Sequence, residues 1–290
     1  MTSPITGIDH VVIAVNDLER AAAVYRRLGF TLSPRGVHSP VLGTANHTIM
    51  LQRDYFELLG IVAPTEANVR WRSALAEGDG IVAAALATPD AAEAHAAWER
   101  SGLHPERTIS FSRPVDRPGG ETVEARFEVV NLPRTAVPGA AVFACGHLTR
   151  EAVWLPELIE HPNTAVALRK VAIAAENVRE TAGAWGHALV GSTVTVDAGS
   201  ARVVLGPHAV EIVDGRAAAA RFGLRAAPAR PKAVALEFAV ADLNVCAKHL
   251  AASGIQTLPG ASAIVIAPEA ACGVALTMVQ VGAAAASRHH

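Results

Sequence analysis

The sequence predicts an α+β fold of four tandem βαβββ modules, with modules one and two paired into a first domain and modules three and four into a second. A helix signal, with a capping residue before it and a glycine after it, recurs four times along the chain. An apolar strand-like segment precedes each helix, and short strand-like runs separated by turns follow it. We give this repetition more weight than any single motif because an internal repeat decides the architecture of the whole chain.

The first module shows the pattern most clearly. Large aliphatic residues occupy every second position of its first strand: Val11, Ile13 and Val15. His10 belongs to the opposite parity and therefore faces away from them. The following helix is expected from Asn16, the predicted cap with Glu19 in the capping-box position, to Gly29. This helix must cover the aliphatic face, so the face that carries His10 is left to line something else.

The other three modules repeat this order. Their helices are expected at residues 88–102, 177–191 and 242–254. Pro89 suits the first helical position of the second helix, and Asn177 with Glu180 forms a capping box in the third. The strands before these helices are expected at residues 81–86, 171–175 and 234–240. Residues 105–120 predict a loop over a cavity mouth, and residues 214–232 predict an exposed connector between modules three and four.

The junction between the two domains is expected between Thr149 and Ala167, where the periodicity breaks. We therefore place an N-terminal domain at residues 1–150, a linker at residues 151–167 and a companion domain at residues 168–283.

Five segments also carry a family resemblance: residues 8–15 (Ile-Asp-His-Val-Val-Ile-Ala-Val), the helix that ends in Leu-Gly-Phe at 28–30, and residues 43–46, 55–60 and 147–163. They resemble the glyoxalase-like branch of the vicinal oxygen chelate superfamily. Members of that superfamily pair βαβββ modules around a U-shaped cavity, in which a divalent metal binds two oxygens of the substrate. The resemblance therefore implies U-shaped mixed sheets here.

The resemblance also implies a metal site. In glyoxalase I and methylmalonyl-CoA epimerase the ligands come from the first and last strands of each module, and His10 and Glu57 match those positions in module one. The first strand of module two, residues 80–87, contains nothing that coordinates, so His147 on its last strand is the candidate third ligand. His10, Glu57 and His147 would suit Fe, Mn, Zn or Ni as a divalent ion. Behaviour with three ligands or without a cofactor stays open, because the fourth ligand of the glyoxalase pattern is missing.

A histidine in an apolar strand is also compatible with a hydrogen-bonded core residue. Glu57 favours the ligand role, because an ionised carboxylate that faces an enclosed space is costly unless it is paired or metal-bound. As its matching position in glyoxalase I implies, Glu57 would be both a ligand and, on detaching, a general base. Tyr55 is a candidate proton donor near the metal, although packing is the more usual role for such a residue.

Two further residues are candidates for binding the substrate. Asn46 has an amide that could orient a substrate oxygen, and Arg126 could bind a substrate carboxylate bidentately. A surface strand with cross-strand salt bridges would explain Arg126 as well. In the second half Lys170 takes the place of His10, and Glu211 that of Glu57, which predicts a salt bridge. The companion domain is therefore expected to hold no metal and to stabilise the first domain or make a homodimer.

Composition narrows the class of protein. The chain has 290 residues, of which 51% are hydrophobic and 18% charged, which is typical of a globular protein with a sizeable core. A net charge of −2 with scattered Lys and Arg predicts neither nucleic acid nor membrane as a partner. The three cysteines form no CxxC pair, and no export signal or apolar run of membrane-spanning length is present, which predicts a cytoplasmic location.

Three functions remain from the sequence. The first is a metal-dependent lyase or isomerase acting on a small-molecule substrate that chelates the cation through adjacent oxygens. The second is an Fe(II)-dependent ring-cleaving dioxygenase of the extradiol type. The third is a non-enzymatic protein that sequesters or confers resistance to a small molecule, for which the small side chains of Ala83, Ala85 and Ala87 leave room.

Overall fold

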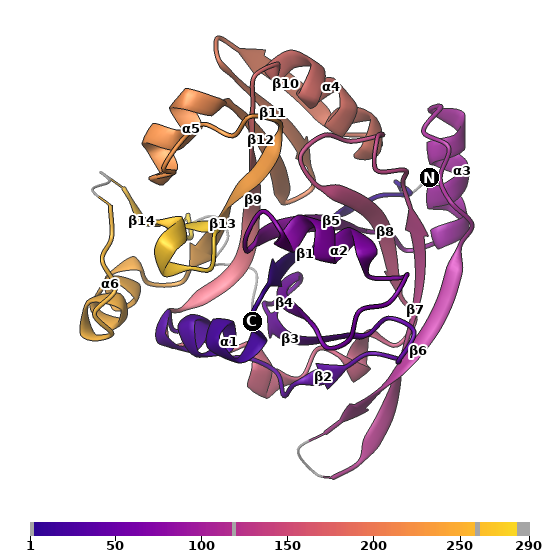
Figure 1. The fold of residues 1–290 in the computed structure, drawn as a ribbon, viewed down its shortest axis with the longest axis horizontal. Coiled ribbons are helices and arrows are strands. Elements are labelled where there is room, and N and C mark those ends of the chain that lie inside the picture. Colours follow the sequence, from indigo (N-terminus) through magenta and orange to yellow (C-terminus); the bar gives the residue numbers. More distant parts are fainter. Residues whose placement is uncertain (1–2, 118–119, 259–261, 283–290) are drawn as a thin grey trace.

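The computed structural model describes residues 3–117, 120–258 and 262–282 and contains two mixed β-sheets with helices packed on them (Figure 1). The first sheet has the strand order β2-β3-β4-β1-β5-β8-β7-β6, and the second has the order β10-β11-β12-β9-β13-β15-β14. Each sheet therefore consists of two modules joined edge to edge, as predicted. The ends of the predicted companion domain and of the chain lie outside the described residues.

The first sheet holds modules one and two. Module one comprises β1 (Gly7–Val15), α1 (Leu18–Arg27), β2 (Gly36–Val37), β3 (Thr44–Met50) and β4 (Tyr55–Ile61). A further helix, α2 (Val69–Leu75), leads to module two, with β5 (Gly80–Ala87), α3 (Ala91–Arg100), β6 (Ile109–Asp116), β7 (Thr122–Asn131) and β8 (Ala141–His147). Within each module the first and last strands pair in parallel, and β1 joins β5 in antiparallel fashion.

The second sheet holds modules three and four. After η1 (Arg150–Ala152) and η2 (Pro156–Leu158) come β9 (Ala165–Ala175), α4 (Val178–Ala188), β10 (Thr193–Asp197), β11 (Ser200–Leu205) and β12 (His208–Asp214). Helix α5 (Gly215–Phe222) precedes β13 (Lys232–Val240), α6 (Leu243–Ala252), β14 (Ala263–Ile266), η3 (Pro268–Ala270) and β15 (Ala275–Gln280). An isolated bridge between Leu258 and Val265 stands in module four where the other modules have a strand.

Helix caps follow the predicted chemistry with two shifts of position. The cap of α1 is Asp17, whose side chain accepts a hydrogen bond from the backbone N–H of Arg20, whereas the predicted cap Asn16 binds Asp79. Asp90 caps α3, so Pro89 lies before the helix and not at its first position. The caps predicted for α4 and α6, at Asn177 and Asp242, are confirmed.

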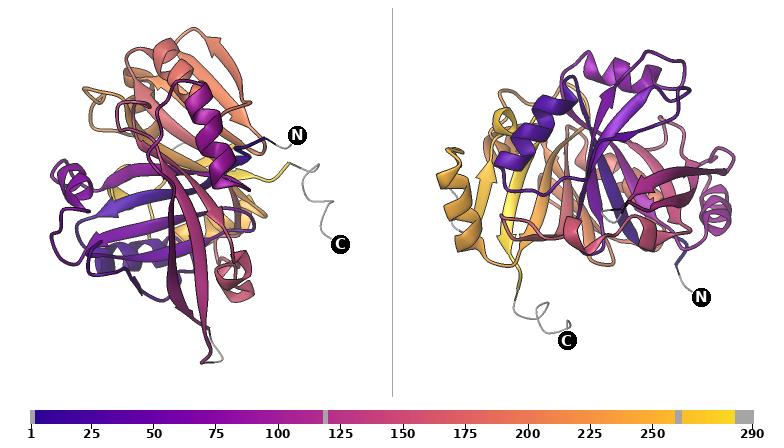
Figure 2. Two further views of the ribbon diagram at one scale, coloured as in Figure 1. Left: turned by 90° about the vertical axis from the view of Figure 1, so that its right-hand side faces the viewer. Right: turned by 90° about the horizontal axis from the view of Figure 1, so that it is seen from below.

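Two segments predicted to be irregular contain regular structure. The loop predicted at residues 105–120 contains β6, which pairs with β7 along its whole length in a hairpin that runs down one side of the molecule (Figure 2). Pro114 is tolerated because β6 is an edge strand; residues 118 and 119 of the predicted loop lie outside the described part. The connector predicted at residues 214–232 contains α5, which Asp214 caps.

The two sheets share one apolar core, to which strands and helices of all four modules contribute. Phe30 and Phe56 of the first half pack on Phe238 of the second, with ring centroids 5.5 and 5.1 Å apart. Hydrogen bonds cross the same boundary: the indole of Trp98 donates to the carbonyl of Ala188 over 2.9 Å. The halves are therefore joined through their helix-covered sides, and the opposite face of each sheet is left for other contacts.

A buried polar link also joins the halves. The backbone N–H of Ile8 donates to Nδ1 of His208 over 3.1 Å, so Nε2 of that ring carries the proton and donates to Asp54 over 3.2 Å. The second oxygen of Asp54 accepts the N–H of Leu168 over 2.8 Å. Burial, the largest influence, raises the pKa of Asp54 above its ordinary value, although these bonds oppose it.

None of the helices in the described ranges has the length and apolar character needed to cross a membrane.

Candidate functional site

The site begins with an irregularity in β1. The pairing of β1 with β5 shifts between Ile8 and His10, so Asp9 is the extra residue of a bulge. Both Asp9 and His10 are buried, with 3% and 5% of their surface exposed. Strict alternation would have sent these neighbours to opposite faces, and the bulge instead brings both into one polar cluster.

Asp9 lies between two histidines. Its Oδ1 atom is 2.7 Å from Nδ1 of His10 and 3.1 Å from Nε2 of His147, which extends from the end of β8. Burial raises the pKa of Asp9, but the hydrogen bonds and charges of the two imidazoles outweigh it and hold this pKa well below its ordinary value. Asp9 is therefore an ionised acceptor at neutral pH.

This geometry assigns the ring protons. Because an ionised carboxylate only accepts, His10 donates from Nδ1 and His147 donates from Nε2. Each ring then keeps one nitrogen for another partner. For His147 that atom is Nδ1, which is buried without a hydrogen-bond partner among the residues that the structure describes. A buried nitrogen left unpaired is costly, and such an atom is a natural ligand position.

Aromatic rings pack around the histidines. His10 stacks on Tyr55 with centroids 4.3 Å apart and meets Phe143 edge-on at 5.5 Å. Phe127 and Trp154 meet His147 edge-on at 5.0 and 5.1 Å. Burial and then the charge of Asp9 raise the pKa of Tyr55 well above its ordinary value, so its hydroxyl stays protonated. The sequence-predicted proton donor Tyr55 thus touches the sequence-predicted ligand His10.

Cys145 completes a group of possible ligands. One donor atom each from Asp9, His10 and Cys145 lies within 4.8 Å of the other two. Burial, and then the charges of Asp9 and Glu57, raise the pKa of the Cys145 thiol well above its ordinary value. A bound cation would reverse this preference, because metal binding displaces the thiol proton. Cys145 was not among the ligands predicted from the sequence.

These residues fit a divalent cation. Bonds of about 2.0–2.3 Å to imidazole, carboxylate and thiolate require donors as close together as these. Asp9 accepts the Nδ1–H of His10, which orients Nε2 in the way that carboxylates orient metal-bound histidines. His147, whose Nε2 contacts Asp9, keeps an unpartnered Nδ1 on the other side of its ring.

Glu57 shares the face of His10, as the alternation predicted, but has a different partner. Tyr55 is the strand neighbour of His10 and Val12 that of Glu57, so His10 and Glu57 are diagonal neighbours on adjoining parallel strands. The amide of Asn46 donates to Oε2 of Glu57 over 2.5 Å. Glu57 is not part of the group within 4.8 Å, and neither is His147. The ligand set predicted from the sequence, His10, Glu57 and His147, therefore stays a prediction. It shares His10 with the group that the structure brings together.

The register explains where His147 lies. Glu57 pairs with Val12, two residues after His10, and the equivalent pair in module two is Ala85 with Phe143. Phe143 thus occupies the place of Glu57. His147 lies at the end of β8, further along the strand than Phe143 and on the same face, beside Asp9. The second module supplies no donor at the positions equivalent to His10 and Glu57.

Arg126 is exposed, and its neighbours Ala125 and Phe127 are buried. Because Phe127 packs on His147, the side chain of Arg126 leaves β7 on the other side and is not brought to the cluster. Two other arginines lie near: Arg113 of β6, 5.8 Å from the ring of Phe127 and one of the charges acting on Tyr55, and Arg150, 3.3 Å from the ring of Trp154. Sequence reasoning missed Arg113 because it assigned β6 to a loop.

The corresponding face of the second sheet is filled by ion pairs. Lys170 lies 3.5 Å from Glu211, which confirms the predicted salt bridge, and 2.7 Å from Glu237. Arg221 of α5 binds the other oxygen of Glu211 at 2.9 Å. Burial raises the pKa of Glu211, but Arg221 and Lys170 outweigh it and lower this pKa. Here the charges neutralise one another without any other ligand.

Comparison with solved structures shows the same fold in proteins of low sequence identity. A hypothetical protein from Staphylococcus aureus matches with a TM-score of 0.68 and 12% identity, over 96% of this chain and 100% of the other. A mutant 4-hydroxymandelate synthase from Streptomyces coelicolor matches with a TM-score of 0.62 and 13% identity, over 96% and 93% of the two chains. The Mn(II)-bound glyoxalase from Novosphingobium aromaticivorans matches with a TM-score of 0.57 and 14% identity, over 96% and 83%.

Comparison with curated protein sequences gives no match. A family model described as a glyoxalase-like domain does match, and it covers residues 8–190, from β1 through the first sheet and the linker to the end of α4. The strands that bear Asp9, His10, Glu57 and Cys145 all lie within that range. The chain therefore belongs to the family of glyoxalase-like domains within the vicinal oxygen chelate superfamily.

Proposed function

We propose that this protein is a metal-dependent lyase or isomerase of the glyoxalase-like kind, acting on a small molecule with two adjacent oxygens. The observation that carries the proposal is the convergence of Asp9, His10 and Cys145, with donor atoms within 4.8 Å of one another in a buried site. Such a convergence of ionisable groups in an apolar setting is costly unless it serves to bind or react.

A divalent cation at this place would supply Lewis-acid stabilisation for the negative charge that develops on substrate oxygens. Asp9 orients His10 and keeps its Nδ1 protonated, so Nε2 is the nitrogen presented to the cation. Phe143 and Tyr55 pack against that ring and limit its rotation. The same apolar rings keep water away from the reacting atoms.

Glu57 is suited to the transfer of a proton. Asn46 holds its Oε2 atom, which leaves Oε1 to accept a proton from a carbon next to the chelating oxygens. Its diagonal position relative to His10 places it beside the proposed cation, on the same face of the sheet. We assign Glu57 the role of general base and Asn46 that of positioning it. Tyr55, with its protonated hydroxyl, is the candidate proton donor.

The alternative is a ring-cleaving dioxygenase that uses Fe(II). Two histidines with one carboxylate, here His10, His147 and Asp9, are the ligand types that non-haem iron oxygenases use. In the structure Cys145, and not His147, belongs to the group of donors within 4.8 Å of one another, which leaves this candidate second.

Metal analysis tests the proposal. Protein purified without chelator should carry about one divalent ion per chain by elemental mass spectrometry, and the variant His10→Ala should lose it. His95→Ala is the matched control, because His95 lies on α3, away from the cluster, and pairs with Glu99. Metal content unchanged in His10→Ala, or a wild-type protein that binds none of the four candidate ions, would contradict both enzyme functions and favour a binding protein. Oxygen consumption with a panel of catechols would instead support the dioxygenase.

A further inference from the structure

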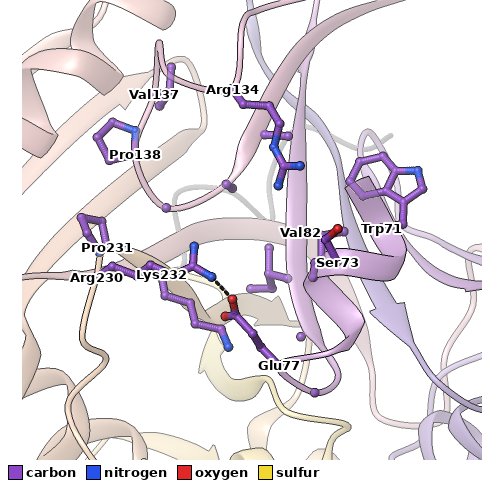
Figure 3. A pocket seen from close by; sticks show the side chains of 17 residues that line it. Trp71, Ser73, Glu77, Val82, Arg134, Val137, Pro138, Arg230, Pro231 and Lys232 are labelled. Carbon is purple, nitrogen blue, oxygen red and sulfur yellow. Dashed lines mark hydrogen bonds and ion pairs between the residues drawn. The ribbon is translucent and has the colours of Figure 1, made fainter. Parts of the chain in front are cut away.

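A cavity lies away from the proposed metal centre. It has a volume of about 400 Å³, within the range of roughly 300–1,000 Å³ that is usual for small-molecule sites. Its walls come from α2, the start of β5, the loop before β8 and the segment that enters β13 (Figure 3). Neither Asp9, His10, Glu57, Cys145 nor His147 lines it.

The lining of this cavity carries an excess of positive charge. Arg134, Arg230 and Lys232 contribute three cations and Glu77 the one carboxylate among the lining residues. Arg230 forms an ion pair with Glu77. The side chains of Arg134 and Lys232 have no hydrogen bond or ion pair with any other residue that the structure describes. Figure 3 shows Arg134 reaching in from one wall, and Arg230 and Lys232 from the opposite wall. Two cations thus face a shared space without a counter-charge.

The walls that carry these cations are fixed by the fold. Gly139 forms a parallel bridge with Lys232, and its carbonyl accepts the N–H of Ala233 over 3.0 Å. Gly139 has a φ of 98°, and a Cβ there would meet Ile173 at 2.8 Å, so this position requires glycine. The indole of Trp185 also donates to the carbonyl of Pro138 over 3.0 Å. The cavity is therefore preformed where the two sheets meet.

Trp71 and the apolar side chains beneath it separate this cavity from the proposed metal centre. Trp71 lines the cavity and packs on the apolar layer of Val12, Leu59 and Ala83. Phe143 packs on that layer too and meets His10 at 5.5 Å. A ligand of this cavity would thus contact Trp71 without reaching the proposed cation.

We infer that this cavity binds a small molecule that carries a dianionic group, with Arg134 and Lys232 contacting its oxygens. The guanidinium offers two parallel donors to a phosphate or a carboxylate, and the ammonium supplies a compact charge from the facing wall. A phosphate monoester carries about two negative charges at neutral pH, and a dicarboxylate carries the same, so both chemistries match two unpaired cations. This site is independent of the proposed metal-dependent reaction.

Isothermal titration of the full-length protein with inorganic phosphate and, separately, with succinate tests this inference. We expect at least one probe to bind, with an affinity that falls as ionic strength rises. Arg134→Gln and Lys232→Gln should each weaken it about ten- to a hundredfold, and the double variant should abolish it. The tighter of the two probes identifies the anionic group.

Two control variants isolate the site. Arg100→Gln, which removes an exposed arginine of α3, should bind the probe as the wild type does. His10→Ala should also retain anion binding, even where it loses the metal, so the two proposals fail separately. No heat of binding for either probe, or a double variant that binds like the wild type, would refute the anion site.

Discussion

At the scale of single residues, the site depends on Asp9, which a bulge in β1 brings beside His10. Alternation placed His10 on the face opposite the large aliphatic residues of its strand, and in the structure His10 belongs to the cluster. Asp9 was not predicted as a site residue because a bulge breaks the two-residue period at that point, and a single sequence does not reveal a bulge. The signal available was an ionisable residue inside an otherwise apolar strand.

Substitution of single ligands decides between the two candidate sets. If Asp9, His10 and Cys145 hold the cation, Cys145→Ser should weaken metal binding about tenfold or more, while Glu57→Gln should keep the metal and lose turnover. If the set is His10, Glu57 and His147, Glu57→Gln should lose the metal and Cys145→Ser should keep it. Titration of the metal-free variants with Zn²⁺ or Mn²⁺ measures the difference.

The lowered pKa of Asp9 makes stability depend on pH. A carboxyl whose pKa is lower in the folded protein stabilises it above the unfolded pKa of about 3.9, and this contribution is lost as the pH falls through the folded value. The variant Asp9→Asn should therefore unfold about 1–3 kcal/mol more easily than the wild type near pH 7. The gap should begin to narrow below about pH 4 and shrink further as the pH falls toward the folded pKa of Asp9. Urea denaturation across that range measures it, and a gap that stays constant would exclude this role for Asp9.

At the scale of elements, helices with a cap and a following glycine were predicted well, and segments without strong periodicity were not. The order strand, helix, strands was visible because each helix has an Asp or Asn whose side chain accepts backbone N–H groups at its start. Strand β6 was taken for a loop because Pro114 suggested a break, yet an edge strand tolerates proline. Helix α5 was missed because it lies in an Ala- and Arg-rich segment that also contains Pro228 and Pro231, which together suggested a connector.

The cap of α1 offers a test at this scale. Asp17→Ala removes the acceptor of the Arg20 N–H and should lower the free energy of unfolding by about 0.5–2 kcal/mol. Asn244→Ala is a suitable control, since Asn244 is exposed on α6 and its side chain has no hydrogen bond to another described residue. Chemical denaturation compares the two, and equal losses would show that capping does not explain where α1 begins.

At the scale of the whole molecule, four modules form two sheets that share one core. The second sheet repeats the fold of the first. At the position that corresponds to the first site, Lys170 forms ion pairs with Glu211 and Glu237. The second sheet still supports the first site, because His208 binds the backbone of Ile8 next to Asp9 and the side chain of Asp54 next to Tyr55. Contacts between distant modules of this kind leave no local pattern, so the sequence did not reveal them.

Removal of this link should be costly. His208→Ala leaves Asp54 buried without its partner and should lower the free energy of unfolding by about 3–5 kcal/mol. The control His187→Ala changes an exposed histidine in the last turn of α4 and should cost little. If the second half also positions Asp9, the His208→Ala variant should bind metal more weakly at the first site under conditions in which it is still folded. A protein as stable as the wild type would show that the link is dispensable.

The central claim is that one cation binds where Asp9, His10 and Cys145 converge. Anomalous diffraction from crystals of protein purified without chelator, recorded at the absorption edge of the metal found by elemental analysis, tests this claim most directly. The account predicts a single strong peak bonded to a nitrogen of His10, with Cys145 or Asp9 among its other ligands. A peak away from His10, or no peak in protein that carries a full equivalent of metal, would contradict it.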